Sequence, residues 1–359
     1  MTLEAVVSRM VSMRMAIMLM AAVLQKPPTL TAQHASDESL KPSNGKLTEG
    51  FSELTSVREL ADGRVLLTDR IDNRVVVADF RTGRVMRIGR IGDGPREYRH
   101  AFPLFAIGGD SSVMTGFPKA RWTLFRADSV VGTTAPMDPT VLATSFPYGM
   151  DRSGHVLTLA DPPPRRLPSG QPVYDSTFLV LLTRGSSRAD TIGTLDVGEW
   201  KAPLFRVYDQ PLLCPDGWTA IVHGSPYKVS WRAPDGRWTA GPVLDTPLRM
   251  DSRERQAYLD RRSDAAKARG PVTAWPEAVP PVSVGWPPMP TMDGQVLIRR
   301  TPTAQFPGPR YDVVDHRGSL THRISVPSDS RILGFGPHSV YLVTADADGI
   351  ETLTRHPWP

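Results

Sequence analysis

The sequence is poor in cysteine, in lysine and in long helical patterns. Its one cysteine, Cys214, excludes an internal disulfide, a cysteine-based zinc site and an iron–sulfur cluster. The 359 residues include 7 Lys beside 35 Arg, and no run of five or more basic residues occurs. Because the excess Arg is scattered, it does not predict the continuous basic surface that tracks a phosphate backbone, and nucleic acid is not an expected partner.

Common catalytic motifs are also absent. The chain has no G-x-S-x-G elbow and no H-E-x-x-H pattern, and its eight His never fall four residues apart. His223 lies two residues before Ser225, but a nucleophile and its base normally come from separate parts of a fold, so we interpret this pair as a turn. His316 and His322 are interpreted as exposed hairpin residues. The motif search therefore predicts no catalytic residues.

The longest apolar run, residues 15–24, reads MAIMLMAAVL and follows Arg9 and Arg14. Ten helical residues span about 15 Å, half of the hydrocarbon core of a bilayer, which is typical of the apolar part of a signal peptide. We expect a signal peptide over 1–32, a flexible lead-in over 33–46 and a periplasmic or secreted mature chain without a membrane span. An uncleaved N-terminal anchor is the alternative.

From residue 47 onward, short apolar runs of period two alternate with Gly-containing turns, which is typical of β-hairpins. The clearest unit, residues 54–90, has four such runs. Five further units follow at 103–135, 146–197, 208–246, 284–326 and 331–357. Because one four-stranded blade leaves faces and edges exposed, such units must stack around an axis and close. The sequence therefore predicts an all-β fold, a six-bladed β-propeller of four-stranded antiparallel blades over 47–359.

Two segments depart from this repeat. The last unit has only three strands, so we expect the N-terminal strand, residues 47–53, to close the last blade. Residues 251–269 predict one inserted helix that Asp251 or Ser252 would cap and that Gly270-Pro271 would end. We interpret this helix as an insertion solvated on one side, and a lid over one face of the ring is the alternative.

The segment Ile88-Gly89-Arg90-Ile91-Gly92-Asp93-Gly94-Pro95-Arg96-Glu97-Tyr98 resembles the G-x-G-P-x-E-F/Y segment of a known family. That family comprises bacterial exported six-bladed β-propeller proteins, which are relatives of the NHL and TolB-like propellers. Residues 334–351 also resemble its last blade, and the resemblance covers residues 47–359. It implies the propeller fold but no particular activity.

Calcium is the one metal ion for which the sequence offers candidate ligands. Six-bladed propellers of the lactonase type hold calcium with carboxylates and Asn, and on that analogy the predicted ligands are Asp69, Asp72 and Asn73. A purely structural turn is the alternative reading of such residues. No other cofactor is expected.

Ligand-binding candidates cluster in and near two proline-rich excursions, 162–172 and 271–290. The predicted ligand-binding residues are Arg261, Arg262, Trp275, Trp286 and, in the segment between blades 1 and 2, Glu97. For Glu97, pairing with Arg90 or Arg99 is the structural alternative.

The leading hypothesis is an exported, non-catalytic, monomeric propeller that binds a protein, peptide or glycan on one face of the ring. The alternative is a propeller lyase or hydrolase, similar to streptogramin lyase or the calcium lactonases, with its site at the central channel. A third hypothesis is a module of a surface complex in which the excess Arg meets an anionic polysaccharide.

Overall fold

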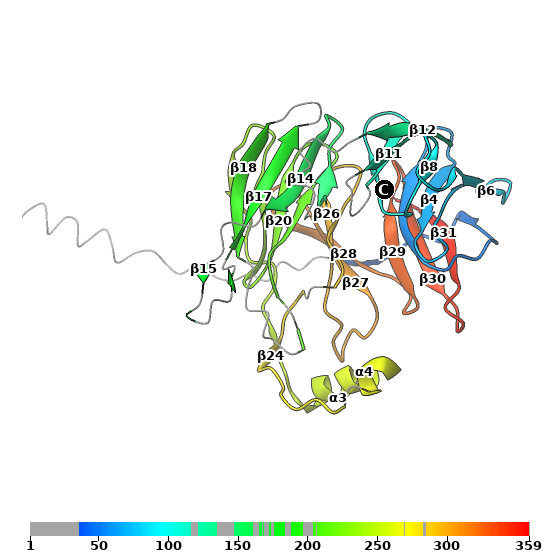
Figure 1. Ribbon diagram of the computed structural model, residues 1–359. Coiled ribbons are helices and arrows are strands. Elements are labelled where there is room, and N and C mark those ends of the chain that lie inside the picture. Colours follow the sequence, from blue (N-terminus) through cyan, green and yellow to red (C-terminus); the bar gives the residue numbers. More distant parts are fainter. Residues whose placement is uncertain are drawn as a thin grey trace, which may run out of the picture. The chain divides into compact units, whose positions relative to one another are not determined.

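Six antiparallel sheets follow one another along the chain (Figure 1). The computed structural model describes residues 36–358 apart from 116–120, 135–146, 161–164, 167, 169–171, 174–175, 184–187, 197–203, 206, 269 and 283–284. The predicted signal peptide, 1–32, lies outside the described residues, as does most of the excursion 162–172.

Each sheet is one blade, and the strands of a blade are named in order from the inside of the ring outward. Blades 1 to 3 consist of β3 (Leu54–Glu59), β4 (Val65–Asp69), β5 (Arg74–Ala78) and β6 (Val85–Ile88); β9 (Leu104–Ala106), β10 (Ser111–Met114), β11 (Trp122–Arg126) and β12 (Ser129–Thr134); β13 (Gly149–Met150), β14 (His155–Ala160), β17 (Ser176–Thr183) and β18 (Ala189–Asp196). Blades 4 to 6 consist of β19 (Gln210–Leu213), β20 (Thr219–Gly224), β21 (Tyr227–Arg232) and β22 (Trp238–Ala240); β25 (Met289–Pro290), β26 (Val296–Arg299), β27 (Arg310–Val314) and β28 (Leu320–Ser325); β29 (Ser330–Phe335), β30 (Ser339–Ala345) and β31 (Glu351–Pro357) with β2 (Gly45–Lys46) outermost. The chain is thus a six-bladed β-propeller, as the repeat predicts.

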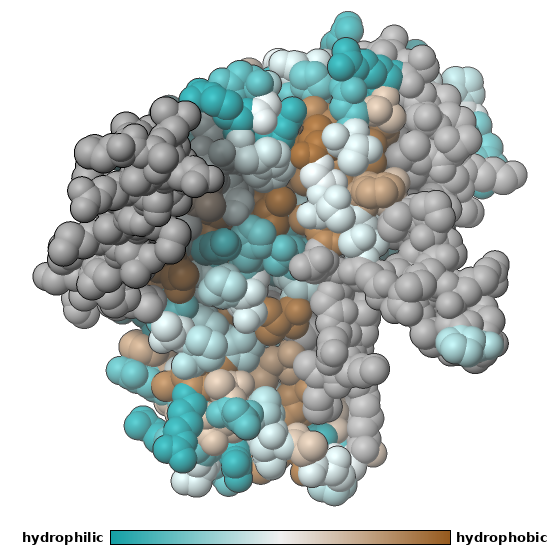
Figure 2. Space-filling model, turned by 90° about the vertical axis from the view of Figure 1, so that its left-hand side faces the viewer, coloured by the Kyte–Doolittle hydropathy of each residue, from teal (hydrophilic) through white to brown (hydrophobic). Residues whose placement is uncertain are grey.

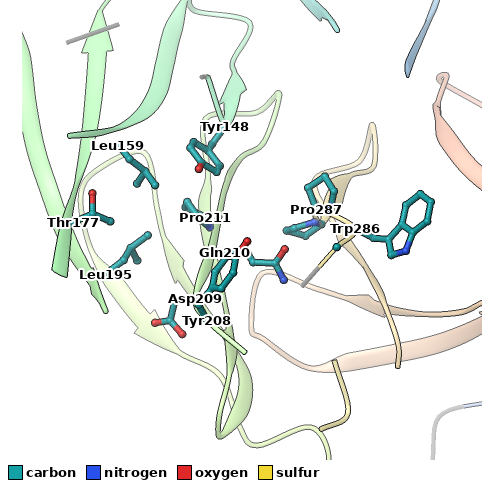
Figure 3. A pocket seen from close by; sticks show the side chains of 12 residues that line it. Tyr148, Leu159, Thr177, Leu195, Tyr208, Asp209, Gln210, Pro211, Trp286 and Pro287 are labelled. Carbon is teal, nitrogen blue, oxygen red and sulfur yellow. The ribbon is translucent and has the colours of Figure 1, made fainter. Parts of the chain in front are cut away.

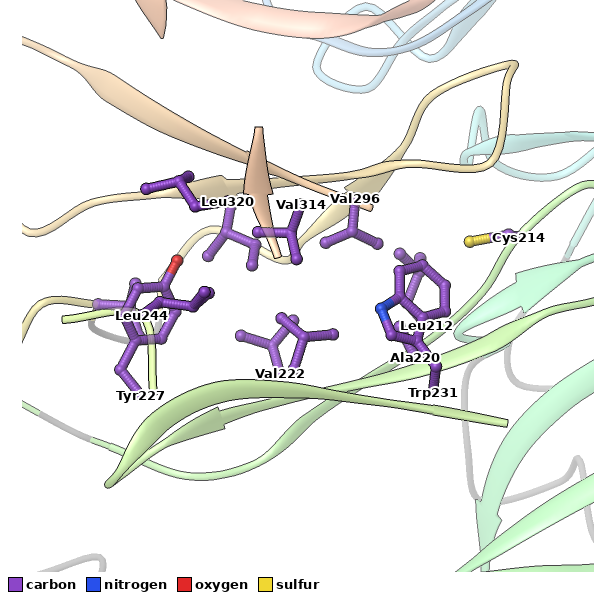
Figure 4. Packing of buried hydrophobic residues seen from close by; sticks show 13 residues of the cluster. Leu212, Cys214, Ala220, Val222, Tyr227, Trp231, Leu244, Val296, Val314 and Leu320 are labelled. Carbon is purple, nitrogen blue, oxygen red and sulfur yellow. The ribbon is translucent and has the colours of Figure 1, made fainter. Parts of the chain in front are cut away.

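The hydrophobic core lies between the blades. One cluster of buried side chains fills each of the six interfaces between neighbouring blades, including the one between blades 6 and 1. Figure 4 shows the cluster between blades 4 and 5, where Val222 and Trp231 of blade 4 face Val296 and Val314 of blade 5. Because the strands alternate, each blade supplies one set of side chains to each neighbour.

The predicted closure of the ring is confirmed. β2 pairs antiparallel with β31, and the pairing continues through Leu47 and Phe51, whose N–H groups donate to the carbonyls of Leu353 and Glu351. Both side chains are fully buried. The pairing starts before the predicted range 47–53 because backbone hydrogen bonds, and not apolar side chains, hold its first residues.

Short elements complete the sheets. β1 (Ser36–Ser39) adds a fifth strand, parallel to β28, at the outer edge of blade 5, so part of the segment expected as a lead-in pairs with the sheets. Three small ribbons connect blades or extend from them: β7 (Arg90–Ile91) with β8 (Glu97–Tyr98), β15 (Arg165–Arg166) with β16 (Pro172–Val173), and β23 (Leu248–Arg249) with β24 (Ala278–Val279).

The inserted helical segment is two consecutive helices, α3 (Ser252–Asp260) and α4 (Asp264–Ala268), and not one helix over 251–269. Asp251 caps α3, as predicted, by accepting the Glu254 N–H at 2.9 Å. The break arises because Ser263 caps α4 in turn, with its Oγ accepting the Ala266 N–H. The buried carboxylate of Glu254 accepts the Ala304 N–H, which fastens α3 to the loop between β26 and β27.

Candidate functional site

One face of the ring, where the inner strands begin, holds two neighbouring cavities; we call it the start face. The first cavity, of about 540 Å³, is lined from blades 1, 2, 5 and 6, and Thr55, Pro103, Met289 and Ile332 mark the starts of their inner strands. Because four inner strands contribute, this cavity lies at the mouth of the central channel, and we call it the axial funnel.

The second cavity, of about 360 Å³, lies between blades 3 and 4, and we call it the side pocket. Leu159 and Leu195 line it from blade 3, and Tyr208 and Gln210 line it from blade 4 (Figure 3). Both volumes fall in the range of about 300–1,000 Å³ that ligand pockets commonly have.

The segment 285–287 lines both cavities and therefore lies between them. It leads into β25 and carries Trp286, one of the predicted ligand-binding residues. Figure 3 shows the Trp286 indole pointing away from Leu159 and Leu195. The predicted excursion 271–290 thus contributes one residue of the expected set to a cavity wall.

Exposed aromatic side chains gather at the side pocket. Tyr148, Tyr208 and Trp286 are 39%, 36% and 48% exposed, and all three line it. On the face displayed in Figure 2, hydrophobic side chains form separate patches among hydrophilic ones. Aromatic rings that stay exposed beside a cavity are typical of binding sites, because they supply contact area at a low entropic cost.

Charged groups in the axial funnel are mostly paired. Arg331 donates to both oxygens of Glu351, at 2.8 and 3.0 Å, and Glu53 pairs with Arg70. Arg299 is different, since its guanidinium carbon lies 4.1 Å from the centre of the Trp286 ring and its Nη1 is buried without a hydrogen-bond partner. No histidine is among the described residues that line the funnel.

A Ser-His-Asp hydrogen-bond relay lies in blade 4. His223 Nδ1 is 2.7 Å from Asp209 Oδ2, and His223 Nε2 is 2.9 Å from Ser230 Oγ. All three side chains belong to partly exposed residues, and Asp209 lines the side pocket. This order of contacts is that of a nucleophilic triad, and it also ties together the first three strands of the blade.

Sequence reasoning missed this relay because it considered only Ser225, two residues after His223. The hairpin between β20 and β21 turns at 225–226 and pairs His223 with Lys228, which places Ser230 diagonally across from the histidine. Period-two alternation on β21 is the signal that could have pointed to Ser230.

The predicted metal ligands form hydrogen bonds with residues just before and just after blade 1. Asp69 is fully buried, and its two oxygens accept the N–H groups of Ser52 and Glu53 at 3.0 Å. Asp72 accepts the Ser52 hydroxyl, and Asn73 bonds the backbone of Arg99 and Ala101. Among the described residues, no group of three or more His, Cys, Asp or Glu side chains is arranged to hold a metal ion.

Glu97 pairs with Arg90, at 2.5 Å, as the structural alternative predicts. Its other oxygen accepts the Gly94 N–H at 2.7 Å. The Gly94 N–H, and then Arg90, hold the pKa of Glu97 below its ordinary value. Glu97 lines neither the axial funnel nor the side pocket.

The other predicted residues lie on or against the helical segment and line neither cavity. Arg261 donates to the carbonyls of Pro302 and Thr303, and Arg262 donates to those of Ala266 and Gly270. Trp275 packs edge-on against Tyr258, with ring centres 5.7 Å apart. Neither α3 nor α4 lines the axial funnel or the side pocket. The two helices therefore do not act as a lid over either cavity in this structure.

A buried polar cluster joins blades 4 and 5 beside this segment. Asp312 has no exposed surface and accepts three hydrogen bonds of 2.8–2.9 Å, from Arg300, Arg323 and the Tyr227 hydroxyl. Burial, and then Asp312, raise the pKa of Tyr227 well above its ordinary value. Asp245, on the solvent side, also pairs with Arg300 at 2.6 Å.

No protein-family model matches this sequence, and no curated protein matches it. Solved structures similar in architecture include a calcium-binding protein, regucalcin, from Agrobacterium tumefaciens, with 11% identity, a TM-score of 0.46, and coverage of 90% of this chain and 97% of that one. Virginiamycin B lyase from Staphylococcus aureus, solved with quinupristin, has 10% identity, a TM-score of 0.43 and coverage of 86% and 97%.

A likeness of this size says nothing about activity, and the strand pairing of the chain itself defines it as a β-propeller. No helix among the described residues is long and apolar enough to span a membrane.

Proposed function

We propose that this chain is an exported ligand-binding propeller whose ligand lies across the start face, from the axial funnel over Trp286 to the side pocket. The observation that carries the proposal is that one segment, 285–287, lines both cavities and bears the most exposed tryptophan beside them. A rigid ring with adjoining hollows and exposed aromatic rings suits an extended ligand such as a glycan or a peptide segment.

A non-catalytic role is favoured at the funnel itself. Its carboxylates, Glu53 and Glu351, are each paired with an arginine, and no histidine lines it among the described residues. Groups held in this way are poorly placed to exchange protons with a substrate.

Replacing Trp286 tests the proposal. Glycan arrays and peptide libraries would identify a ligand of the full chain, and Trp286→Ala is expected to weaken its binding by about tenfold or more, because truncating a central aromatic contact commonly costs about 1–3 kcal/mol. Trp238→Ala is the matched control, because Trp238 is 40% exposed but lines neither cavity. Equal affinity of both variants would contradict the proposed site.

A second candidate function, hydrolysis beside the side pocket, is favoured by the Ser230–His223–Asp209 relay, of which Asp209 lines that pocket. In this reaction Ser230 Oγ would attack an ester or amide carbonyl, and His223 Nε2 would take the hydroxyl proton and give it to the leaving group as the bond to that group breaks. A water molecule, deprotonated by the same Nε2, would then attack the acyl-Ser230 ester, release the acid and leave the proton on Ser230 Oγ. Asp209 would hold the imidazole through Nδ1.

A fluorophosphonate reagent tests the second candidate. Hydrolysis predicts covalent labelling of Ser230, detected by mass spectrometry, that disappears in Ser230→Ala and His223→Gln. An unlabelled wild-type chain, together with a lower melting temperature of Asp209→Ala, would assign the relay to the stability of blade 4 instead.

A further inference from the structure

Arg299 is the last residue of β26 and lines the axial funnel. Its guanidinium carbon lies 4.1 Å from the centre of the Trp286 ring, so the cation lies over the face of the indole. A cation–π contact of this kind holds the guanidinium in place but satisfies none of its N–H groups.

The charge balance of the funnel leaves Arg299 without a counter-ion. Arg331 is neutralised by Glu351 and also donates to the Leu54 carbonyl at 2.7 Å, while Glu53 is taken up by Arg70. Within the described part of the chain, no carboxylate lies within ion-pair distance of Arg299, and its Nη1 is buried without a hydrogen-bond partner.

Such an arrangement is costly for the unliganded protein. Buried N–H groups and charges are normally paired, because otherwise they lose their hydration without replacement. Burial, and to a lesser degree the nearby Arg331, lower the pKa of Arg299. An anion in the cavity of about 540 Å³ that Arg299 lines would supply the missing charge and would accept from those N–H groups of Arg299 that reach the cavity.

We propose that Arg299 is the anion-recognition residue of the start face and that it binds the carboxylate of a uronic-acid residue in an acidic glycan. This inference rests on the proposed function and names its ligand class. The planar guanidinium matches a carboxylate with two parallel hydrogen bonds, which a neutral sugar cannot accept in the same way.

The surroundings favour a sugar over a peptide as the bearer of this carboxylate. Trp286 separates the funnel from the side pocket, which Tyr148, Tyr208 and Gln210 line. Aromatic rings beside a hydrogen-bonding group suit a chain of sugar rings, each of which has apolar faces and a rim of hydroxyls.

The test compares trigalacturonic acid with its neutral methyl ester by calorimetry on the full chain. The acid is expected to bind, and Arg299→Gln is expected to weaken it by at least about tenfold, because charge-assisted hydrogen bonds are lost. Arg299→Lys should fall between the two, since it keeps the charge but not the fork. Arg81→Gln, a fully solvated site outside both cavities, is the charge-matched control and should bind as wild type.

The melting temperature of Arg299→Gln is measured separately to check that the variant folds. It is expected to be no lower than that of wild type, because the substitution removes an unpaired charge. Equal binding of acid and ester, or unchanged binding by Arg299→Gln, would overturn the inference. If a neutral glycan binds and is lost in Trp286→Ala but not in Arg299→Gln, the proposed function stands and the carboxylate assignment fails. Binding of an acidic peptide such as triglutamate, in place of trigalacturonic acid, would overturn the glycan class.

Discussion

Deletion of residues 41–53 is expected to lower the melting temperature of the propeller by about 10 °C or more. Leu47 and Phe51 are fully buried, and each side chain contributes roughly 1.5–3 kcal/mol through removal of apolar surface from water. The hydrogen bonds to Leu353 and Glu351 are lost with them. Since each kcal/mol shifts the midpoint of a large domain by about 2–4 °C, the combined loss is easily measured by calorimetry.

The same deletion leaves β31 as an open strand edge, so light scattering should also rise on heating. Deletion of residues 36–39 is the control. β1 likewise pairs with an outer strand, but all four of its residues are exposed, so a smaller loss is expected, mainly from the ion pair of Asp37 with the buried Arg310. An unchanged melting curve after removal of 41–53 would show that closure by this strand does not hold the ring.

Asp312→Ala is expected to destabilise the chain by about 3–5 kcal/mol, because it removes the fully buried carboxylate between two largely buried arginines and leaves them only the partly exposed Asp245 as counter-ion. Arg300 and Arg323 both donate to Asp312, and the Tyr227 hydroxyl loses its acceptor as well. Urea denaturation followed by tryptophan fluorescence measures the free energy of unfolding.

Asp245→Ala is the matched control for this prediction, because Asp245 pairs with the same Arg300 but its side chain is 31% exposed. A loss of about 1 kcal/mol or less is expected there, as for other solvated ion pairs. Similar losses of unfolding free energy in the two variants would mean that burial does not increase the contribution of Asp312 to stability.

Local pattern predicts much of this fold. In blade 1 the runs of Val and Leu, the turns at Gly63 and Gly83 and the period of two place all four strands within two residues of where they lie. The positive φ at both glycines, 82° and 72°, is the conformation that such tight turns require. The break between α3 and α4 was not predicted, because the sequence around Ser263 is also compatible with one continuous helix and only weakly indicates a second cap.

The candidate site was much less predictable. Arg299 and Arg300 are adjacent and identical in type, yet Arg300 pairs with Asp312 and Asp245 while Arg299 stacks on Trp286. Successive residues of an extended chain point to opposite sides, so the two side chains meet different partners. Which carboxylates are already paired depends on contacts between distant segments, and no local pattern encodes them. Trp286 was predicted from its proline-rich setting, whereas Trp275 shares that setting and packs against α3 instead.

The order of synthesis gives the closing strand a further consequence. Arg355 of β31 bonds the side chain of Asn44, which directly precedes β2 and lies 311 residues earlier, so β2 can pair only after β31 has been made. Until then blades 1 to 5 can stack as an open row, but β2 has no strand to pair with, and contacts so distant along the chain form slowly. Synthesis of β31 is therefore the step that allows a row of blades to close into a ring.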